Sequence, residues 1–414
     1  MEKNLAAQLG NRLSPQSLSL IRITGTLAAE LRFGLYLVGG VVRDILLGRD
    51  NLDLDLVVEG DAPELARSLA ERISAKVLVH RRFRTANLQY EGLSIDLTTA
   101  RSEAYAHPGA LPTVCPGSIR DDLLRRDFTI NAMAIHLDPE NFGDLVDPFS
   151  GEADLRQKLI RILHQKSFVD DATRMLRAIR YEQRFGFQLE KSTELLLRQN
   201  LSMLGTISGD RIRHELELIL KEYRPEDPLE RAAELGLLQR VHPSLKGNGW
   251  LRNKYQQARL VSTPPLTLHF ALLTYRFSNE EIEDFIARLR IPGKTASVIR
   301  DTSRLKEKLP SLGVSELLPS SIYHLLQGYS PTSVLACAIA SDPVIVRQRL
   351  HLYLNKLRYV KTSLDGEALQ QMGMRPGPHL GEMLRTLHEA RLDGRVKAKE
   401  EEIQFVRLRP AKGE

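Results

Sequence analysis

The sequence has only two cysteines among its 414 residues, Cys115 and Cys337, and they lie far apart. This spacing excludes a cysteine-based zinc scaffold and a disulfide framework, and it favours a reducing cytosol. No apolar run approaches the roughly 20 residues that cross a bilayer. The first residues, MEKNLAAQLGNRLS, contain no hydrophobic signal core. We therefore expect a cytoplasmic protein without a membrane partner.

A strong excess of one charge is also lacking, because 58 lysines and arginines face 52 acidic residues, a net charge of +6. Such an excess is compatible with a phosphate-rich partner but does not establish one. Internal repeats and low-complexity runs are absent as well. With 42% hydrophobic and 27% charged residues, the composition is that of a globular chain. Its length predicts two to four domains.

The first third of the chain has a mixed α/β pattern. Helical periodicity predicts helices over residues 15–33 and 62–74. Residues 102–118 contain Pro108, Gly109, Pro112, Pro116 and Gly117 and are expected to form a loop. Short apolar or alternating runs predict strands over residues 35–40, 53–58, 76–80, 86–92 and 93–100.

Strand signals nearly vanish after about residue 155. Amphipathic helices are expected at residues 168–185, 190–204, 209–222 and 226–240. Helical patterns continue to residue 414, with breaks near 243–249, 262–265, 308–320 and 374–379. The predicted architecture is an α/β head followed by an all-helical remainder.

Asp53 and Asp55 lie two residues apart on a predicted strand, so both carboxylates leave the same face. Adjacent carboxylates repel unless a cation neutralises them, and hard oxygen ligands favour magnesium. Two-metal sites use such pairs to activate a hydroxyl and to stabilise phosphate charge. Taken alone, the pair is a weak signal, and a turn-proximal or salt-bridged pair is the favoured interpretation.

Two neighbouring features support a phosphate site. Gly39 and Gly40 precede Arg43, which places exposed backbone N–H groups and a guanidinium upstream of the aspartates. An ordinary strand-to-helix turn is the other interpretation. Asp96 lies in the later strand pattern of residues 93–100, either as a third metal ligand and base or as an outward-facing strand residue.

Three segments together resemble the class II tRNA nucleotidyltransferase (CCA-adding enzyme) and bacterial poly(A) polymerase family. The first is LVGGVVRDILLGRDNLDLDLVVEG, residues 37–60. The second is RRDFTINAMAI, residues 125–135, and the third is VDPFSGEADL, residues 146–155. ISGDRIRHELELIL, residues 207–220, is similar to a further motif of the family that supports the neighbouring helix.

The resemblance implies a DNA polymerase beta-like α/β nucleotidyltransferase head followed by an all-α neck, body and tail. In this family an RNA 3′-hydroxyl attacks the α-phosphate of a nucleotide and pyrophosphate leaves. Asp53 and Asp55 would bind Mg2+, with Asp96 as the third catalytic acid. The nucleotide-binding residues expected in the head are Gly39, Gly40, Arg43, Arg125, Arg126, Asp127 and Asn131.

Base selection is expected from Asp171 and Arg174, which are three residues apart and would share a helix face. A carboxylate accepts from the exocyclic amine of C or A, while a guanidinium donates to ring nitrogen or oxygen. A surface ion pair is the structural alternative. Arg177 and Arg180 continue the basic face toward triphosphate or RNA. Asp170 stands where the family usually has Glu.

The resemblance divides the chain into a head over residues 1–155, a neck with the base template over 156–225, and a tRNA-binding body and tail over 226–414. Residues 364–406 resemble the tail of bacterial tRNA nucleotidyltransferases, and Pro376-Gly377-Pro378 there begins a helix. A second candidate RNA face comprises Arg347, Arg349, Lys356, Arg358 and Lys361.

Two departures from the family pattern bear on the product. Arg84 occupies a position where the family often has Gly, and the 102–117 segment differs from the charged flexible loop of enzymes that add all three nucleotides. In the family that loop helps the switch from C to A addition. Addition of CCA, of CC alone or of A alone therefore all remain open.

The expected function is addition of C and A to the 3′ end of tRNA from CTP and ATP, with Mg2+ and without an obligatory protein partner. A poly(A) polymerase is the alternative within the family, and the tail resemblance speaks against it. A nucleotide-sugar glycosyltransferase would have no use for RRDFTINAMAI. A catalytically inactive RNA-binding module would not need the three carboxylates.

Overall fold

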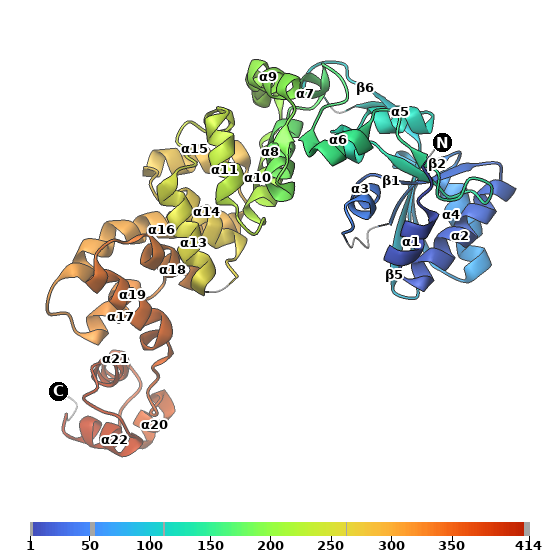
Figure 1. The fold of residues 1–414 in the computed structure, drawn as a ribbon. Coiled ribbons are helices and arrows are strands. Elements are labelled where there is room, and N and C mark those ends of the chain that lie inside the picture. The colour runs from blue at the N-terminus through green and yellow to red at the C-terminus, as the bar shows by residue number, and fades with distance from the viewer. Residues whose placement is uncertain (1–2, 50–53, 111, 262, 410–414) are drawn as a thin grey trace. The chain divides into compact units, whose positions relative to one another are not determined.

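The computed structural model describes residues 3–49, 54–110, 112–261 and 263–409 (Figure 1). The chain forms two compact units, one of Met1–Ile219 with Arg231–Val241 and one of Leu220–Glu230 with His242–Glu414. Each unit is described by itself. Within the described ranges, no helix has both the length and the apolar character needed to cross a membrane.

The first unit contains a seven-stranded sheet in the order β3-β4-β5-β2-β1-β8-β9. Only β2 and β5 pair in parallel; the other neighbours are antiparallel. The predicted strands of the head are therefore confirmed over their described residues. The strands are β1 (Gly34–Val38), β2 (Leu54–Glu59), β3 (Lys76–His80), β4 (Thr85–Tyr90), β5 (Leu93–Thr99), β8 (Ala134–His136) and β9 (Leu145–Val146).

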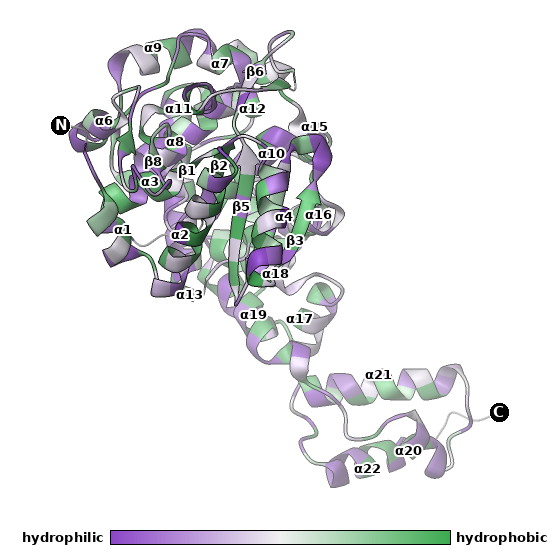
Figure 2. Cartoon of the chain, turned by 90° about the vertical axis from the view of Figure 1, so that its right-hand side faces the viewer, coloured by the Kyte–Doolittle hydropathy of each residue, from purple (hydrophilic) through white to green (hydrophobic). Residues whose placement is uncertain are grey.

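Helices α2 (Pro15–Glu30) and α4 (Ala62–Ile73) pack on one face of this sheet (Figure 1). Ser14 and Asp61 begin them, each accepting a hydrogen bond from a backbone N–H of the first turn. Alternate residues of β2 and β5 form the core beneath these helices, and their apolar side chains colour β5 green in Figure 2. The remaining helices near the N-terminus are α1 (Ala6–Arg12) and α3 (Gly40–Leu46).

The loop prediction for residues 102–118 is wrong in part. Residues Arg101–Ala104 form β6 and Thr113–Pro116 form β7, and the two pair antiparallel as a hairpin. Ser118 then begins α5 (Ile119–Leu124) with a capping box that includes Asp121. Arg84 adopts a φ of 49°, in the left-handed region that glycine adopts most easily. The glycine that the family often has at this position would therefore suit the backbone here.

The rest of the first unit is mainly helical, as predicted. A two-residue parallel pair, β10 (Leu159–Ile160) with β11 (Gln188–Leu189), links the segments before α7 (Ser167–Asp170) and after α8 (Thr173–Phe185). The other elements are η1 (Arg81–Phe83), η2 (Thr129–Asn131), α6 (Gly151–Gln157), α9 (Lys191–Gln199), η3 (Leu201–Thr206), α10 (Gly209–Leu220), α11 (Glu226–Glu234) and α12 (Leu237–Val241).

The second unit is all-helical in its described residues. Leu305, Val334, Cys337 and Leu350 are among the side chains of its main core. The helices that build this part are α13 (Gly249–Val261), α14 (Leu266–Leu273), α15 (Asn279–Leu289), α16 (Gly293–Lys308), η4 (Leu309–Gly313), α17 (Pro319–Leu326), α18 (Pro331–Ala340), α19 (Val344–Asn355) and η5 (Leu357–Tyr359).

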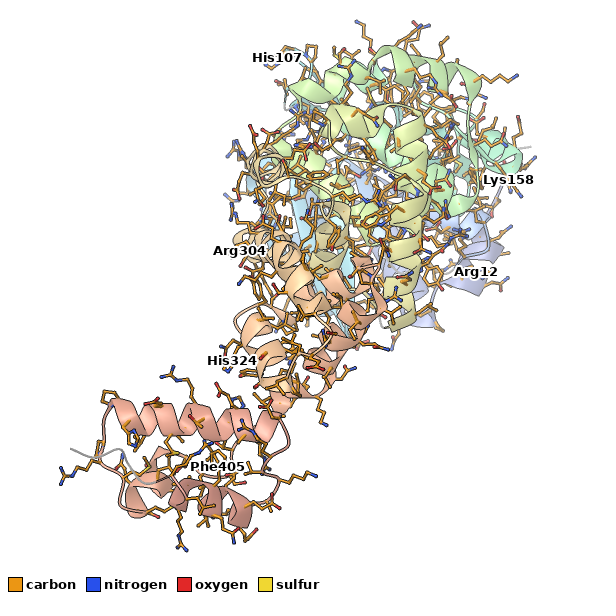
Figure 3. The ribbon with its side chains drawn as sticks, turned by 90° about the vertical axis from the view of Figure 1, so that its left-hand side faces the viewer. Arg12, His107, Lys158, Arg304, His324 and Phe405 are labelled. Carbon is orange, nitrogen blue, oxygen red and sulfur yellow. The ribbon has the colours of Figure 1, made fainter. Side chains whose placement is uncertain are left out.

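A smaller core follows near the C-terminus, among α20 (Gly366–Gln371), α21 (Pro378–Leu392) and α22 (Lys399–Arg407). Phe405, labelled in Figure 3, packs against this core. Gly377 begins α21, which confirms the helix start predicted at the Pro-Gly-Pro sequence. Glu402 is fully buried and pairs with Arg391 at 2.9 Å.

One residue of the second candidate RNA face, Arg349, is not exposed to a ligand. Arg349 is buried and donates hydrogen bonds to the carbonyl groups of Leu312, Val314 and Ser315. Its guanidinium therefore satisfies the backbone at the end of η4. The prediction of an RNA-facing role for Arg349 is wrong because sequence spacing does not distinguish an exposed helix face from a buried one.

Candidate active site

A cavity of about 810 Å³ opens in the first unit, between the sheet and the helices α8 and α10. Its walls combine residues from segments more than 150 positions apart in the sequence. Seven arginines and six carboxylates line it, so side chains of both charges face the space. The predicted site residues among its walls are Gly40, Arg43, Asp55, Arg125, Arg126, Asp127, Asn131, Asp171, Arg174 and Arg177.

Two of the carboxylates predicted to be catalytic, Asp55 and Asp96, lie on the two parallel strands. Leu54 and Leu56 point into the core under α2 and α4, so Asp55 leaves the opposite face of β2 and lines the cavity. Asp96 is the register partner of Asp55 on β5 and is also exposed. Asn87 donates to Asp96 Oδ1 at 2.7 Å. Asp53 lies outside the described residues.

The chemistry of this donor set fits a hard divalent cation. Asp55 and Asp96 present carboxylate oxygens from neighbouring strands, and oxygen ligands of this kind suit Mg2+. Between residues 54 and 110 and in the other described ranges, no group of three or more His, Cys, Asp or Glu side chains forms a metal cluster. Asp53, two positions before Asp55, would supply the third carboxylate.

Gly39 and Gly40 make the turn from β1 into α3. Gly39 has a φ of 79°, a conformation that favours glycine, and a Cβ there would lie 2.6 Å from Arg126 Nη1 and would displace this guanidinium. The Gly39 N–H donates to the Met133 carbonyl and is not the exposed anion ligand that the sequence suggested. Gly40 lines the cavity. Arg126 is held by Asp122 Oδ2 at 3.0 Å.

A chain of hydrogen bonds fixes the predicted ribose pair. Arg43 Nη1 donates to Asn131 Oδ1 at 2.6 Å, and Asn131 Nδ2 donates to Asp127 Oδ1 at 2.9 Å. Asp44 accepts two further hydrogen bonds from Arg43, both 2.9 Å. Buried and bonded in this way, the side chains are set before any ligand arrives.

The chain of hydrogen bonds continues from Asp127 to Arg177 on α8. Its Oδ2 accepts from Arg177 Nε at 2.9 Å and from Arg177 Nη2 at 2.6 Å. Burial alone raises the pKa of Asp127, but Arg177 and Asn131 outweigh it and hold that pKa below its usual value. Arg180 does not line the cavity; it is buried and lies 3.7 Å from Glu215, over the ring of Tyr181.

The structure corrects the prediction that Asp171 lies within a continuous helix. Asp171 has extended backbone angles between α7 and α8, and its Oδ1 accepts from the N–H and hydroxyl of Thr173 at 3.0 and 2.6 Å. It therefore caps α8. Arg211 on α10 pairs with its Oδ2 at 2.8 Å. The interpretation of Asp171 and Arg174 as a mere surface ion pair is also wrong, since each bonds to other groups.

Arg174 is buried, and its guanidinium is held from two sides. Nη1 donates to the Ser167 hydroxyl at 2.7 Å, and Nη2 donates to the Arg125 carbonyl at 2.6 Å. The latter bond links α8 to the RRDFTINAMAI segment of the head. Asp171 and Arg174 both reach the same cavity, which an acceptor and a donor need in order to read the edge of one base.

Several wall residues were not identified from the sequence. Glu103 and Tyr105 come from the β6–β7 hairpin, where Tyr105 donates to Glu103 at 2.7 Å and Glu103 pairs with Arg125 at 3.2 Å. A Cβ at Gly109, in the same hairpin, would lie 2.6 Å from the Thr206 carbonyl, so the tip packs closely on η3. Other such residues are Pro112, Thr173, Tyr181, Arg184, Asp210 and His214.

Residues of the third motif, 146–155, hold the backbone next to the site in place. Asp147 accepts from the backbone N–H groups of Gly151 and Glu152 at 2.7 and 2.9 Å and so begins α6. Asp154 accepts from the Thr129 hydroxyl at 2.7 Å, which ties α6 to the turn that carries Asn131. The motif thus stabilises the backbone of the site.

Family models match two parts of the chain. Residues 35–161 match the poly A polymerase head domain, and residues 186–247 match the probable RNA and SrmB-binding site of polymerase A. The head therefore defines the protein as a nucleotidyltransferase of the DNA polymerase beta-like class.

Relatives extend the match to nearly the whole chain. The A-adding tRNA nucleotidyltransferase of Halalkalibacterium halodurans is 34% identical over 98% of this chain and 95% of its own. The A-adding tRNA nucleotidyltransferase of Geobacter sulfurreducens is 35% identical over 97% of this chain, but the match covers only 48% of that relative. The match to the Aquifex aeolicus enzyme likewise covers 44% of the relative's length. The chain thus spans about half the length of these two relatives.

Solved structures agree. A CCA-adding enzyme in an apo form matches with a TM-score of 0.86 and 32% identity over 98% of this chain and 99% of that one. The Thermotoga maritima CCA-adding enzyme complexed with tRNA matches with a TM-score of 0.81 over 98% of both chains. The protein belongs to the tRNA nucleotidyltransferase and poly(A) polymerase family. This membership excludes the glycosyltransferase alternative.

Proposed function

We propose that this protein adds the terminal A to the 3′ end of tRNA from ATP, in the cytoplasm. The observation that carries the proposal is the cavity of about 810 Å³, where Asp55, the Asp127–Asn131 pair and the Asp171–Arg174 pair meet. A carboxylate for metal, a ribose contact and a base reader are the parts that such a reaction requires.

Each part has a role in the proposed reaction. Asp53, Asp55 and Asp96 would hold Mg2+, which supplies charge stabilisation at the α-phosphate and activation of the 3′-hydroxyl. Asp127 and Asn131 position the ribose. The triphosphate lies among the arginines of the cavity, with Gly39 shaping the turn beside Arg126. Gly40, Arg43, Arg125, Arg126 and Arg177 complete the proposed nucleotide-binding set; Arg180, which is buried and does not line the cavity, is not part of it.

Asp171 and Arg174 select the base. Asp171 accepts from the exocyclic amine that A and C share, and Arg174 donates to a ring nitrogen or oxygen. U and G lack an amine donor at the matching edge position, so they give the carboxylate no hydrogen bond and bind less well. Thr173, Arg211 and Ser167 hold the two readers in place.

Terminal A is the product that the relatives favour. Three relatives at 34–37% identity are named A-adding enzymes, and one at 30% is named a CC-adding enzyme. The relatives named CCA-adding are 27–28% identical, and the solved CCA-adding structures are 32% identical. The β6–β7 hairpin differs from the flexible loop associated with the switch from C to A. Addition of the whole CCA is the second candidate, because the CCA-adding structure with a TM-score of 0.86 covers nearly the whole chain.

The proposal is tested on three tRNAs, which lack the whole CCA end, lack CA, or lack only the terminal A. With Mg2+, ATP and CTP, we expect extension of the last substrate alone. Extension of all three would establish CCA addition, and C incorporation alone would establish a CC-adding enzyme. Long tails on non-tRNA primers with ATP would identify a poly(A) polymerase. No incorporation on any substrate would refute the proposal.

Arg211 is expected to act as a positioning residue for Asp171. Arg211→Gln removes the 2.8 Å ion pair, so the carboxylate loses half of its fixed partners. We expect discrimination against UTP and GTP to fall by about tenfold, with kcat for ATP less affected. Arg213→Gln on the same helix is the matched control, because Arg213 pairs with Asp210 and Glu217 instead. Unchanged kcat/KM ratios among the four nucleotides in Arg211→Gln would contradict this role.

A further inference from the structure

The second unit carries an aromatic and cationic cluster that the site above does not use. Trp250, the single tryptophan of the chain, lies at the start of α13. The Arg276 guanidinium lies 4.2 Å from the centroid of the Trp250 ring, and the Tyr275 ring stacks on Trp250 with centroids 5.9 Å apart. Stacking of this kind restricts an arginine and leaves its N–H groups directed outward.

Lys254, one turn further along α13, is buried beside this stack. Its Nζ lies 5.9 Å from the Trp250 ring, and the nearest carboxylate, Asp342, is 3.9 Å away and almost fully exposed. Burial lowers the pKa of Lys254, Asp342 opposes this, and Arg347 and Arg276 lower that pKa further. Geometry agrees, because Arg276 shares the Trp250 ring with Lys254, and Arg347 lies in α19 five residues after Asp342, the carboxylate 3.9 Å from Lys254.

The cluster holds more positive charge than its surroundings neutralise. In the described residues, no carboxylate lies within ion-pair distance of Arg276 or Arg347, and one exposed carboxylate serves Lys254. Arg252, Arg259 and Arg300 of the same unit each pair with a glutamate. Three neighbouring cations with only one carboxylate nearby repel one another. An anion with several acceptor oxygens would reduce this repulsion.

We propose that Arg276 and Arg347, beside the buried Lys254, form a binding site for backbone phosphates of RNA. The inference rests on the proposed function, since a tRNA is the polyanion that this enzyme handles. Arg276 follows α14 and Arg347 lies on α19, so two segments of the second unit supply the cations. The planar, stacked guanidinium of Arg276 is suited to bidentate hydrogen bonds with a phosphate. Such a contact does not depend on the RNA sequence.

The experiment measures tRNA affinity against salt for the full chain with Arg276→Gln, Arg347→Gln and both changes. Each single change is expected to weaken binding roughly threefold to tenfold and to reduce the salt slope of log Kd by about 0.9, and the double change by about twice that. Arg304→Gln is the matched control, because Arg304, labelled in Figure 3, is an exposed arginine paired with Asp301. KM for tRNA should rise in the cluster variants while kcat stays unchanged.

Trp250 provides a second readout. Since it is the single tryptophan and contacts Arg276, its fluorescence should change when tRNA binds and should not change with inorganic phosphate at equal phosphate concentration. A response to inorganic phosphate, together with unchanged tRNA affinity in the double variant, would overturn the proposal in favour of a small-anion site. Unchanged tRNA affinity and salt slope without such a response would also overturn it.

Failure of this site and failure of the proposed function give different results. If the wild type extends tRNA but the double variant binds tRNA as tightly as the wild type, the phosphate site is refuted and the function stands. If the wild type binds tRNA through the cluster but adds no nucleotide, the function is refuted and the phosphate site stands. Circular dichroism of each variant confirms that the helices are intact.

Discussion

Asp55→Asn is expected to lower the rate of nucleotide addition by about 10³-fold or more while the head stays folded. Asp55 is exposed on β2 and is the register partner of Asp96. An amide keeps the shape of the side chain but cannot neutralise a divalent cation. Metal-assisted charge stabilisation contributes several kcal/mol, and each ~1.4 kcal/mol corresponds to a factor of ten in rate.

The measurement is single-turnover addition of A to a tRNA that lacks only this nucleotide, with saturating ATP and Mg2+. Glu71→Gln serves as the control, because it removes one negative charge from an exposed position of α4 on the helix-covered side of the sheet. We expect the control to act like the wild type and Asp55→Asn to retain its thermal midpoint. A rate within a factor of ten of the wild type would show that the metal site is misplaced.

Arg177→Met is expected to reduce the free energy of unfolding of the first unit by about 3 kcal/mol. Arg177 donates twice to Asp127, lies 3.4 Å from Glu215, and contacts the ring of Tyr181. Methionine keeps much of the packing volume but leaves the buried Asp127 without its cation. Breaking a buried pair from one side is costly because the remaining charge cannot regain its hydration.

The loss should depend on pH in a defined direction. The pKa of Asp127 lies below its usual value in the folded state, so the pair contributes fully above the unfolded-state pKa of about 3.9. As the pH falls through the lower folded-state pKa, Asp127 becomes protonated and the contribution disappears. In the variant, burial without Arg177 raises the pKa of Asp127, so the difference between wild type and Arg177→Met should be constant near neutral pH and begin to shrink once the pH falls to that raised pKa.

Urea unfolding at several pH values checks this prediction. Arg198→Met is the control, since Arg198 forms an exposed pair with Glu194 on α9, and such pairs contribute about 0–1 kcal/mol. Equal stability of Arg177→Met and the wild type at neutral pH would contradict the account. So would a difference that grows as the pH falls.

The sequence predicted the architecture of the head well because its strands are short, apolar and separated by turn residues. The loop prediction for residues 102–118 failed because Pro108, Gly109 and Pro112 interrupt any alternation, while β6 and β7 are paired mainly by backbone hydrogen bonds. The break at Asp171 was missed because Asp is compatible with a helix by periodicity. Its carboxylate instead competes for the first N–H groups of α8.

Residues carried by the three motifs were named correctly as cavity walls in most cases, since motif spacing reflects the constraints of one pocket. Glu103, Tyr105 and His214 were missed because their proximity depends on how the hairpin and α10 fold onto α8. Arg349 shows the opposite error. It was predicted to contact RNA, but its guanidinium donates hydrogen bonds to backbone carbonyl groups. Sequence patterns indicate charge, but partners become known only in the folded chain.

The central claim is that the cavity of the first unit adds A to the 3′ end of tRNA. The most direct measurement is incorporation of labelled ATP into a tRNA that ends in CC, by the wild type and by Asp55→Asn side by side. The account predicts one added A with the wild type and at least about 10³-fold less with the variant. No incorporation by the wild type, or equal incorporation by both proteins, would contradict it.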